Sequence, residues 1–257
     1  MIRYIARATK FIHHAIKTSD LGLAGTSNLF GEEQLSLDVL ADRIIMDNLK
    51  VSGLVANAIS EESEEETVFE HELKDETYSV AYDPLDGSSL VDTNLAIGSI
   101  FSIYKSGPFI GKTGREQVAA LYAVYGPRTT LVYTTGKGVH EFTLNDVYEY
   151  SLTREDIKIS DTSKYFAPGN LRAAQDNPKY KKLVDDWMLK GYTLRYSGGM
   201  VPDLNHILLK GQGIFTYPPF PPKYPNGKLR LLFECNPFAF LMEMAGGASM
   251  IPAVSSP

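Results

Sequence analysis

The sequence predicts a mixed protein of helices and strands, in which a strand-rich region lies between helical segments. Segments 1–18 and 33–51 repeat apolar residues at helical spacing. Between 54 and 160 the pattern changes to short apolar or alternating runs separated by Gly and Pro turns, which is typical of strands. After residue 160, helical and strand patterns alternate again. This mixture places the protein in the α/β or α+β class.

The N-terminal half is predicted to contain two helices followed by a series of strands. The apolar side of the first helix, over 1–18, consists of Ile2, Ile5, Ala6, Ile12 and Ile16. A loop over 22–31, rich in Gly, Ser, Thr and Asn, leads to the second helix, over 33–51. Strands are expected at 54–60, 78–82, 97–104, 139–143 and 147–152, and a pair of strands over 117–133 turns at Gly126-Pro127-Arg128.

The C-terminal half is predicted to form a second region. Alternation over 156–160 predicts a strand that crosses into it. Asn177-Pro178 and Gly191 bound a helix over 175–190, because these residue types favour helix starts and ends. Further helices are expected at 200–209 and 237–245, and strands at 192–196, 214–217 and 229–233. We therefore predict two sub-domains, 1–160 and 161–257.

Composition narrows the classes of function. The net charge of −6 over 257 residues gives no electrostatic reason to expect nucleic-acid binding. Cys235 is the single cysteine, so no intrachain disulfide can form. No apolar run reaches the roughly 18–20 residues that a membrane span needs. We expect a cytoplasmic protein with no nucleic-acid or membrane partner. Basic charges near the N-terminus leave organellar targeting as an alternative to a folded amphipathic helix.

The most informative segment is Asp83–Ser89, in which two carboxylates stand three residues apart. The strand before it is expected to stop at Asp83, because the proline that follows cannot continue a central ladder. Asp83 and Asp86 would project from a strand end, where oxygen ligands suit Mg²⁺ or Mn²⁺. Gly87, Ser88 and Ser89 offer N–H groups and hydroxyls that can surround a phosphate. The segment predicts metal-assisted phosphoryl chemistry, and the alternative is a plain Asp-Pro turn.

Two further acidic positions fit such a site. Glu61 and Glu62 follow an apolar strand and could share cations with the aspartates, whereas the rest of that acidic loop reads as a solvated charge run. Asp38 lies among apolar residues on the second helix and could orient a water. The simpler interpretation of Asp38 is a surface residue on the polar side of the helix.

Basic residues later in the chain suit phosphate groups. Lys228, Arg230 and Glu234 would share one face of the strand predicted near the C-terminus. They are costly to bury unless phosphate meets the cations and metal meets the carboxylate. The alternative is an edge strand with a solvated face. Arg195 and Tyr196, placed before two glycines, suit a second phosphate site.

These segments resemble the class I fructose-1,6-bisphosphatase and sedoheptulose-1,7-bisphosphatase family, over nearly the whole chain. The most specific segments are Ser60–Glu62, Asp83–Ser89, Arg195–Met200, Gly213–Phe215 and Lys228–Glu234. The resemblance implies a layered α/β/α/β/α sandwich of the sugar bisphosphatase type, with two sub-domains, assembled as a homodimer or homotetramer. The first sub-domain would carry most metal ligands, and the second the sugar and distal phosphate site.

The resemblance also implies a role for each site residue. Two or three Mg²⁺ (or Mn²⁺) ions per site would be held by Glu61, Glu62, Asp83, Asp86, Glu234 and the Leu85 carbonyl. Asp38 and Glu62 would polarise the attacking water. The phosphate to be cleaved would be surrounded by Gly87, Ser88, Ser89 and Arg230. The sugar and its distal phosphate would be bound by Asn170, Tyr196, Tyr217 and Lys228, while Arg195 would reach the site of a neighbouring subunit.

The predicted reaction is Mg²⁺-dependent hydrolysis of the 1-phosphate of sedoheptulose-1,7-bisphosphate, giving sedoheptulose-7-phosphate and phosphate. Gly199 and Ala173 resemble the sedoheptulose branch and are expected to leave room beside a larger sugar, whereas Tyr217 is more similar to the fructose branch. Fructose-1,6-bisphosphate is therefore the alternative substrate. An inositol monophosphatase-like enzyme is a further alternative. Lys228 and Arg195 argue against it, because they would bind a distal phosphate. A non-catalytic sugar-phosphate sensor should lack one of the metal carboxylates, and all are present.

Overall fold

Two helices cover one face of a large sheet. The computed structural model describes residues 1–18, 36–69, 76–221, 224–225 and 227–250. Helix α1 spans Ile2–Thr18 and α2 spans Leu37–Ser52, close to the predicted ranges. Their buried side chains, such as Ile5 and Ile45, pack against the sheet in one hydrophobic core. The predicted loop at 22–31 and the first residues of the second predicted helix, 33–35, lie outside the described residues.

The large sheet has eight strands in the order β2-β1-β3-β4-β5-β6-β7-β8. In chain order these are β1 Val55–Ser60, β2 Thr67–Val68, β3 Tyr78–Asp86, β4 Ile97–Lys105, β5 Gln117–Tyr125, β6 Thr129–Thr134, β7 His140–Leu144 and β8 Tyr150–Arg154. β1 and β3 run parallel, and all other neighbours in this sheet are antiparallel. β8 begins later than predicted because the Asn145 side chain accepts the N–H groups of Val147 and Glu149 and forms a turn.

Two further helices, both predicted from the sequence, cover the opposite face of the large sheet. They are α4, Met200–Lys210, and α5, Asn236–Met244. Ile100 of β4 packs with Val201 of α4 and Phe238 of α5 in a second hydrophobic core. The start of α4 lies very close to the sheet, since a Cβ added to Gly98 would lie 2.3 Å from Val201 Cγ1. This close approach brings α4 to the end of β3.

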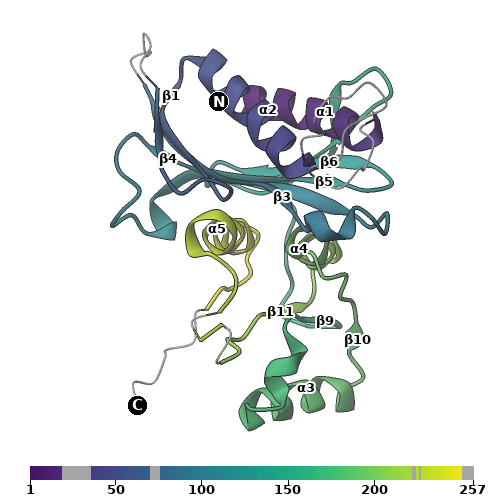
Figure 1. The fold of residues 1–257 in the computed structure, drawn as a ribbon. Coiled ribbons are helices and arrows are strands. Elements are labelled where there is room, and N and C mark those ends of the chain that lie inside the picture. Colours follow the sequence, from purple (N-terminus) through teal and green to yellow (C-terminus); the bar gives the residue numbers. More distant parts are fainter. Residues whose placement is uncertain (19–35, 70–75, 222–223, 226, 251–257) are drawn as a thin grey trace.

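A small parallel sheet and one more helix complete the layers. β9, Tyr165–Pro168, lies between β10, Thr193–Leu194, and β11, Ile214–Thr216. Helix α3, Pro178–Leu189, packs on this sheet through Val184 and Trp187. The layers run helix, sheet, helix, sheet, helix (Figure 1), and the predicted α/β/α/β/α sandwich is confirmed.

Several connecting segments differ from the predictions. Segment 156–160 is not a strand, because its N–H groups donate to three separate carbonyls, those of Val139, Ala245 and Gly211, each at 2.8 Å. Segment 229–233 leads into a π-helical turn at Leu231–Cys235 instead of forming a strand. Short 3₁₀ turns lie at Ser88–Leu90, Gly114–Glu116 and Leu171–Ala174. Within the described ranges, no helix combines the length and apolar character needed to cross a membrane.

Candidate active site

A bulge in β3 turns Asp83 and Asp86 to the same side of the large sheet. Side chains three residues apart on a regular strand point to opposite faces. Here Asp83 pairs with Ile100 and Asp86 with Gly98, so three steps on β3 match two steps on β4. Both carboxylates therefore face α4 and α5, as Ile100 does. The predicted stop of the strand at Asp83 is wrong, because a bulge leaves residues unpaired and so accommodates Pro84.

Hydrogen bonds hold both aspartates in place. The Leu85 N–H donates to Asp83 Oδ1 at 2.9 Å, and Leu85 itself is buried. The Val201 N–H, at the start of α4, donates to Asp86 Oδ2 at 2.7 Å. The Pro84 carbonyl accepts a hydrogen bond from a side chain of β4 at 2.7 Å. Hydrogen bonds therefore connect this part of β3 both to β4 and to α4.

Glu234 enters the same space from the π-helical turn before α5. The Arg230 N–H donates to Glu234 Oε2 at 2.6 Å and fixes the side chain. The sequence predicted a strand here, with Lys228, Arg230 and Glu234 on one face, and this prediction is wrong. A short apolar run does not distinguish a strand from a buried helical turn. Pro237, in the first turn of α5, favours the helical conformation.

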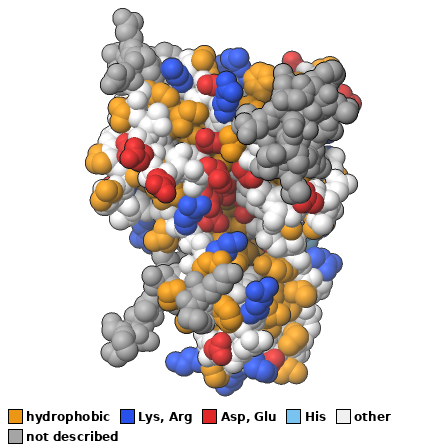
Figure 2. Space-filling model, in the orientation of Figure 1, with side chains coloured by type: hydrophobic (Ala, Val, Ile, Leu, Met, Phe, Trp, Pro, Cys, Tyr) orange, Lys and Arg blue, Asp and Glu red, His pale blue; other side chains and the backbone are white. Residues whose placement is uncertain are grey.

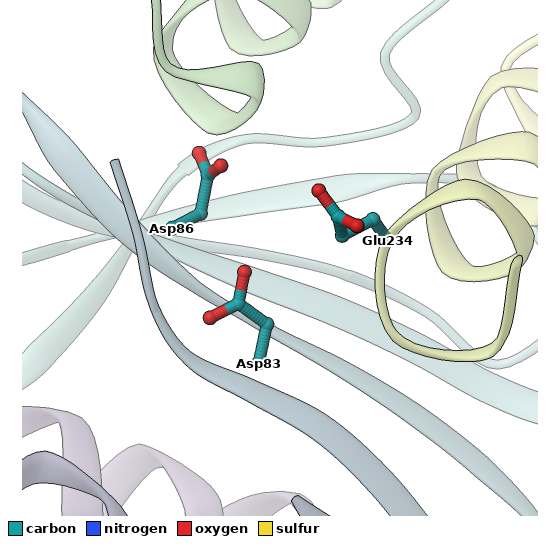
Figure 3. A group of neighbouring side chains, drawn as sticks. All are labelled: Asp83, Asp86 and Glu234. Atoms are coloured by element: carbon teal, nitrogen blue, oxygen red, sulfur yellow. The ribbon is translucent and has the colours of Figure 1, made fainter. Parts of the chain in front are cut away.

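The carboxylates of Asp83, Asp86 and Glu234 face one common space (Figure 3). One oxygen of each lies within 4.8 Å of the others, and the residues are only 5, 9 and 7 % exposed. Three ionised carboxylates at this spacing repel one another unless a cation or protons neutralise them. Their oxygen atoms are the ligands that Mg²⁺ and Mn²⁺ prefer. The structure thus brings together three predicted metal ligands in an arrangement that fits a divalent cation.

Burial raises the pKa of each carboxyl in this cluster, and repulsion within the cluster adds to the rise for Asp83 and Glu234. Burial, and then the charge of Asp86, raises the pKa of Glu234 to about 7. Burial raises the pKa of Asp86 to about 6, although N–H groups at the start of α4 oppose the rise. The pKa of Asp83 lies well above its ordinary value because of burial and the charges of Asp86 and Glu234. A divalent cation would therefore compete with protons for this cluster.

Glu61 forms an ion pair with Arg230. The Arg230 guanidinium donates to the Glu61 carboxylate and, at 3.1 Å, to the Glu61 carbonyl. A predicted metal ligand and a predicted phosphate ligand thus neutralise each other at the end of β1. Lys228 lies close enough to Asp86 and Glu234 to lower the pKa of both. The two predicted phosphate-binding cations therefore border the carboxylate cluster.

Asp38, in the first turn of α2, and Glu62, just after β1, lie near each other beside the carboxylate cluster. Burial raises the pKa of Glu62, and the charges of Asp38 and Asp42 add to this rise. The charge of Glu62 in turn contributes to the raised pKa of Asp83. Burial raises the pKa of Asp38, although a hydrogen bond with Ser88 opposes the rise. The structure therefore brings the two predicted water-polarising residues together beside the predicted phosphate turn.

The turn at Gly87–Ser89 directly follows the two aspartates. Gly87 has a φ of +80°, which glycine adopts without strain. A Cβ at Gly87 would lie 3.5 Å from the Cα of Gly199, so the two glycine-containing segments adjoin. Ser88 is half-buried and Ser89 is exposed. The turn adjoins the carboxylates, so a phosphate bound by its N–H groups and hydroxyls would lie next to a cation held by the cluster.

Three predicted sugar-binding residues gather at one end of the small sheet. The Asn170 side chain donates to the Pro218 carbonyl at 2.8 Å. Burial raises the pKa of Tyr196, and Tyr217 adds to this rise while a hydrogen bond from the Asn170 backbone opposes it. The Tyr217 ring packs on Gly169, where an added Cβ would lie 2.5 Å from Tyr217 Cδ2. Asn170, Tyr196 and Tyr217 therefore lie close together, each just after a strand of the small sheet.

Arg195 makes its contacts with its own small sheet. Its guanidinium lies over the Tyr165 ring, 5.9 Å from the centroid, and donates to the Leu194 carbonyl at 2.9 Å. The side chain is exposed. The predicted reach of Arg195 into a neighbouring subunit stays a prediction.

Two acidic residues that the sequence did not single out also support the site. Asp203 is buried and accepts the N–H groups of 197–198 at 2.7 and 3.4 Å, which holds the glycine-rich segment before α4. Asp42 accepts the Tyr82 hydroxyl at 2.8 Å. Each carries a weak sequence signal: Asp203 lies in the first turn of a helix, and Asp42 lies one turn after Asp38.

The surface of this region is acidic with a basic border. Figure 2 shows acidic side chains at the centre of one face of the molecule and basic side chains next to them. An anionic substrate can approach such a centre only if cations neutralise it. The residue types therefore suit a phosphate compound bound together with divalent metal.

Two family models match the chain: fructose-1-6-bisphosphatase, N-terminal domain, over residues 1–155, and fructose-1-6-bisphosphatase, C-terminal domain, over residues 159–253. The chain belongs to the fructose-1,6-bisphosphatase family. This confirms the family resemblance predicted from the sequence. It also confirms the enzyme class, because the relatives of the family are sugar bisphosphatases, which are phosphoric monoester hydrolases.

Relatives named for fructose-1,6-bisphosphate and for sedoheptulose-1,7-bisphosphate are both similar to this chain. The class 1 fructose-1,6-bisphosphatases of Syntrophotalea carbinolica and Geobacter sulfurreducens are each 55 % identical to it, over 97 % of this chain and 77 and 78 % of their own lengths. The chloroplastic sedoheptulose-1,7-bisphosphatase of Spinacia oleracea is 44 % identical, over 95 % of this chain and 63 % of its own length. Identity therefore favours the fructose branch, against the preference predicted from the sequence.

Solved structures of the family share the fold. The assigned sedoheptulose-1,7-bisphosphatase of Toxoplasma gondii has a TM-score of 0.85 at 35 % identity, over 97 % of this chain and 83 % of its own. The holo form of Leishmania major fructose-1,6-bisphosphatase has a TM-score of 0.83 at 32 % identity, over 95 % of this chain and 81 % of its own. The two structures are nearly equally similar, so the fold does not separate the two substrates.

Proposed function

We propose that the protein hydrolyses the 1-phosphate of fructose-1,6-bisphosphate in a Mg²⁺-dependent reaction. The main support is the convergence of Asp83, Asp86 and Glu234 beside the Gly87–Ser89 turn, in a chain 55 % identical to class 1 fructose-1,6-bisphosphatases. This choice replaces the sedoheptulose substrate favoured by the sequence, because the sedoheptulose relative is 44 % identical.

The packing around Gly199 and Ala173 bears on the room that they were expected to leave for a larger sugar. A Cβ on Gly199 would lie 3.1 Å from Pro202 and 3.3 Å from Leu90, so the missing side chain leaves space next to those two residues. Ala173 is 2 % exposed and packs in the core beneath α3. Sedoheptulose-1,7-bisphosphate remains the second candidate substrate, because the similar Toxoplasma gondii structure carries that assignment.

The carboxylates of the site have separate tasks in this proposal. Asp83, Asp86 and Glu234 would hold divalent metal, with Glu61, Glu62 and the Leu85 carbonyl completing a set of two or three ions. Bound Mg²⁺ supplies positive charge that stabilises the phosphoryl group in the transition state and favours ionisation of a water. Asp38 and Glu62 would orient the attacking water and accept its proton. Asp38 is close to Ser88 of the phosphate turn, and Glu62 is close to Asp83 of the metal cluster.

The phosphate and sugar would occupy the basic side of the cluster. Arg230 would turn from Glu61 to the 1-phosphate once that carboxylate binds a cation, because the two side chains neutralise each other in the structure. Gly87, Ser88 and Ser89 would donate hydrogen bonds to the same phosphate. The sugar and distal phosphate would be bound by Asn170, Tyr196, Tyr217 and Lys228, with Arg195 supplied by a neighbouring subunit of a homodimer or homotetramer.

The predicted sub-domains assign these tasks to different parts of the chain. Residues 1–160 would hold most metal ligands, and residues 161–257 would bind the sugar and distal phosphate. Glu234 would then be a metal ligand supplied by the second sub-domain, so both sub-domains would be needed for metal binding. The division and the cytoplasmic location stay predictions.

A side-by-side comparison of substrates tests this function. Phosphate release would be measured with fructose-1,6-bisphosphate, sedoheptulose-1,7-bisphosphate and inositol-1-phosphate at one Mg²⁺ concentration. We expect the highest kcat/KM for the six-carbon ketose bisphosphate and no significant release from inositol-1-phosphate. A higher kcat/KM for the seven-carbon substrate would establish the second candidate. Preference for inositol-1-phosphate would contradict both.

A further inference from the structure

A series of polar contacts leads from the backbone of Glu62 to α2 beneath the candidate active site. The Glu62 N–H donates to Ser60 Oγ at 3.2 Å. The Ser60 side chain lies close enough to the Tyr82 hydroxyl to oppose the rise in the pKa of that hydroxyl. Tyr82 donates its proton to Asp42 Oδ1 at 2.8 Å.

The central residues of this series of contacts are fully buried. Ser60 and Tyr82 are 0 % exposed, and they face each other as paired residues of the parallel strands β1 and β3. The Tyr82 ring packs against Phe101, with the centroids 6.0 Å apart. A buried hydroxyl that loses its partner is unfavourable. The Asp42 carboxylate therefore keeps Tyr82 in one orientation and ties α2 to the sheet.

The hydrogen bond between Tyr82 and Asp42 restrains both residues that are expected to orient the attacking water. Asp38 lies one helical turn before Asp42 on α2, so fixing Asp42 also fixes Asp38. Glu62 follows Ser60 at the end of β1, and the neighbouring Glu61 N–H donates to the Tyr82 carbonyl at 2.9 Å. The backbone that carries Glu62 is thus bound to β3 on one side and to the buried hydroxyls on the other.

We propose that Tyr82 and Asp42 are positioning residues that keep Asp38 and Glu62 at a fixed separation for the attack of water. The proposal rests on the proposed function, in which Asp38 and Glu62 act on that water. Tyr82 is buried beneath the site and acts through Ser60 and α2. Its loss should lower kcat and leave KM almost unchanged, because the bound water loses its orientation while the sugar contacts remain.

The test uses two substitutions that each remove the hydrogen bond between Tyr82 and Asp42. Tyr82→Phe removes only the hydroxyl, and Asp42→Ala removes its acceptor. Each should lower kcat roughly 5- to 50-fold with KM within about twofold. The double variant should lose no more than either single variant, because both remove the same bond. Asp42→Asn should retain most activity, since its side-chain oxygen still accepts the Tyr82 hydroxyl.

Tyr122→Phe is the matched control. Tyr122 is also a fully buried strand residue, and its hydroxyl donates at 2.9 Å to Asn205 Oδ1 on α4. The control loses the same kind of hydrogen bond between a strand and a helix, and it has no contact with Glu62. We expect a loss of thermal stability similar to that of Tyr82→Phe and an unchanged kcat. Equal kcat losses in the two variants would overturn the positioning role.

Hydrogen exchange supplies a measurement that is independent of catalysis. Peptides covering 59–63 should exchange faster in Tyr82→Phe and Asp42→Ala than in the wild-type protein, and no faster in Tyr122→Phe. Unchanged exchange in an active enzyme would overturn the positioning role alone. A wild-type protein that hydrolyses none of the three substrates would overturn the proposed function, and with it the catalytic part of this proposal.

Discussion

Replacement of Glu234 by Gln is expected to stabilise the metal-free protein while abolishing its activity. Gln keeps the shape of the side chain, and its oxygen can still accept the Arg230 N–H, which lies 2.6 Å from Glu234 Oε2. The substitution removes one of three buried negative charges, because Asp83 and Asp86 share the same space. Without metal, those charges repel each other. When metal is present, the three negative charges are needed to bind the cation.

The pKa of Glu234 gives the size and the pH range of this effect. Burial, and then the charge of Asp86, raises this pKa from 4.5 to about 7. The folded protein therefore holds the proton more tightly than the unfolded chain does. The resulting stability is complete below pH 4.5 and is lost as the pH rises through about 7. At ~1.4 kcal/mol per pKa unit, the loss approaches ~3 kcal/mol at pH 8. Gln does not titrate and avoids this loss.

Thermal unfolding in EDTA at pH 5 and pH 8 measures the effect. At pH 8 we expect Glu234→Gln to melt roughly 4–12 °C above the wild-type protein, and at pH 5 the difference should be small. Added Mg²⁺ should raise the wild-type Tm more than that of the variant. Phosphate release by the variant in Mg²⁺ should fall to background.

Glu141→Gln serves as the control for a buried carboxylate that has a cationic partner. Glu141 is 2 % exposed, and its carboxylate lies 3.0 Å from Arg154 Nε. Its replacement should lower stability at both pH values and leave catalysis intact, because it breaks an ion pair remote from the metal cluster. The reasoning is refuted if Glu234→Gln melts at or below the wild-type temperature in EDTA at pH 8.

Three further outcomes follow from the site. Asp83→Asn should lose at least ~100-fold in kcat with an unchanged circular dichroism spectrum, because the amide loses the charge that holds metal; near-normal kcat would remove Asp83 from the metal site. Lys228→Met should raise KM for fructose-1,6-bisphosphate roughly 10- to 100-fold and change kcat less, since a phosphate contact is lost; an unchanged KM would contradict a phosphate-binding role. Dithiothreitol should leave kcat/KM unchanged, because Cys235 has no intrachain partner; activation by the reductant would point to an intermolecular disulfide.

Local patterns were sufficient to predict most of the elements. The period of the apolar residues in α1 and the turn between β5 and β6 depend on neighbouring residues alone, and both are confirmed. The bulge at Pro84 and the π-helical turn before α5 depend on packing between layers. Neither could be predicted, because a proline in a strand and a short apolar run each allow two local structures.

The residues that could bind metal were easier to predict than the contacts between side chains in the site. Asp83 and Asp86 stood out by type and spacing, and the structure brings them together with Glu234. The ion pair between Glu61 and Arg230 joins residues that are 169 positions apart, so no local pattern could reveal it. The expected roles of Gly199 and Ala173 were inferred from their small size, and no local pattern could show that a Cβ on Gly199 would meet Pro202 and Leu90 or that Ala173 packs in the core beneath α3.

Phosphate release from fructose-1,6-bisphosphate before and after removal of metal tests the central claim most directly. Protein treated thoroughly with EDTA should release no phosphate above background, because Asp83, Asp86 and Glu234 would then hold no divalent cation to stabilise the phosphoryl group and to favour ionisation of the attacking water. Addition of Mg²⁺ or Mn²⁺ in excess of the chelator should restore full activity. Full activity in the chelated protein would contradict a metal-dependent site at this cluster.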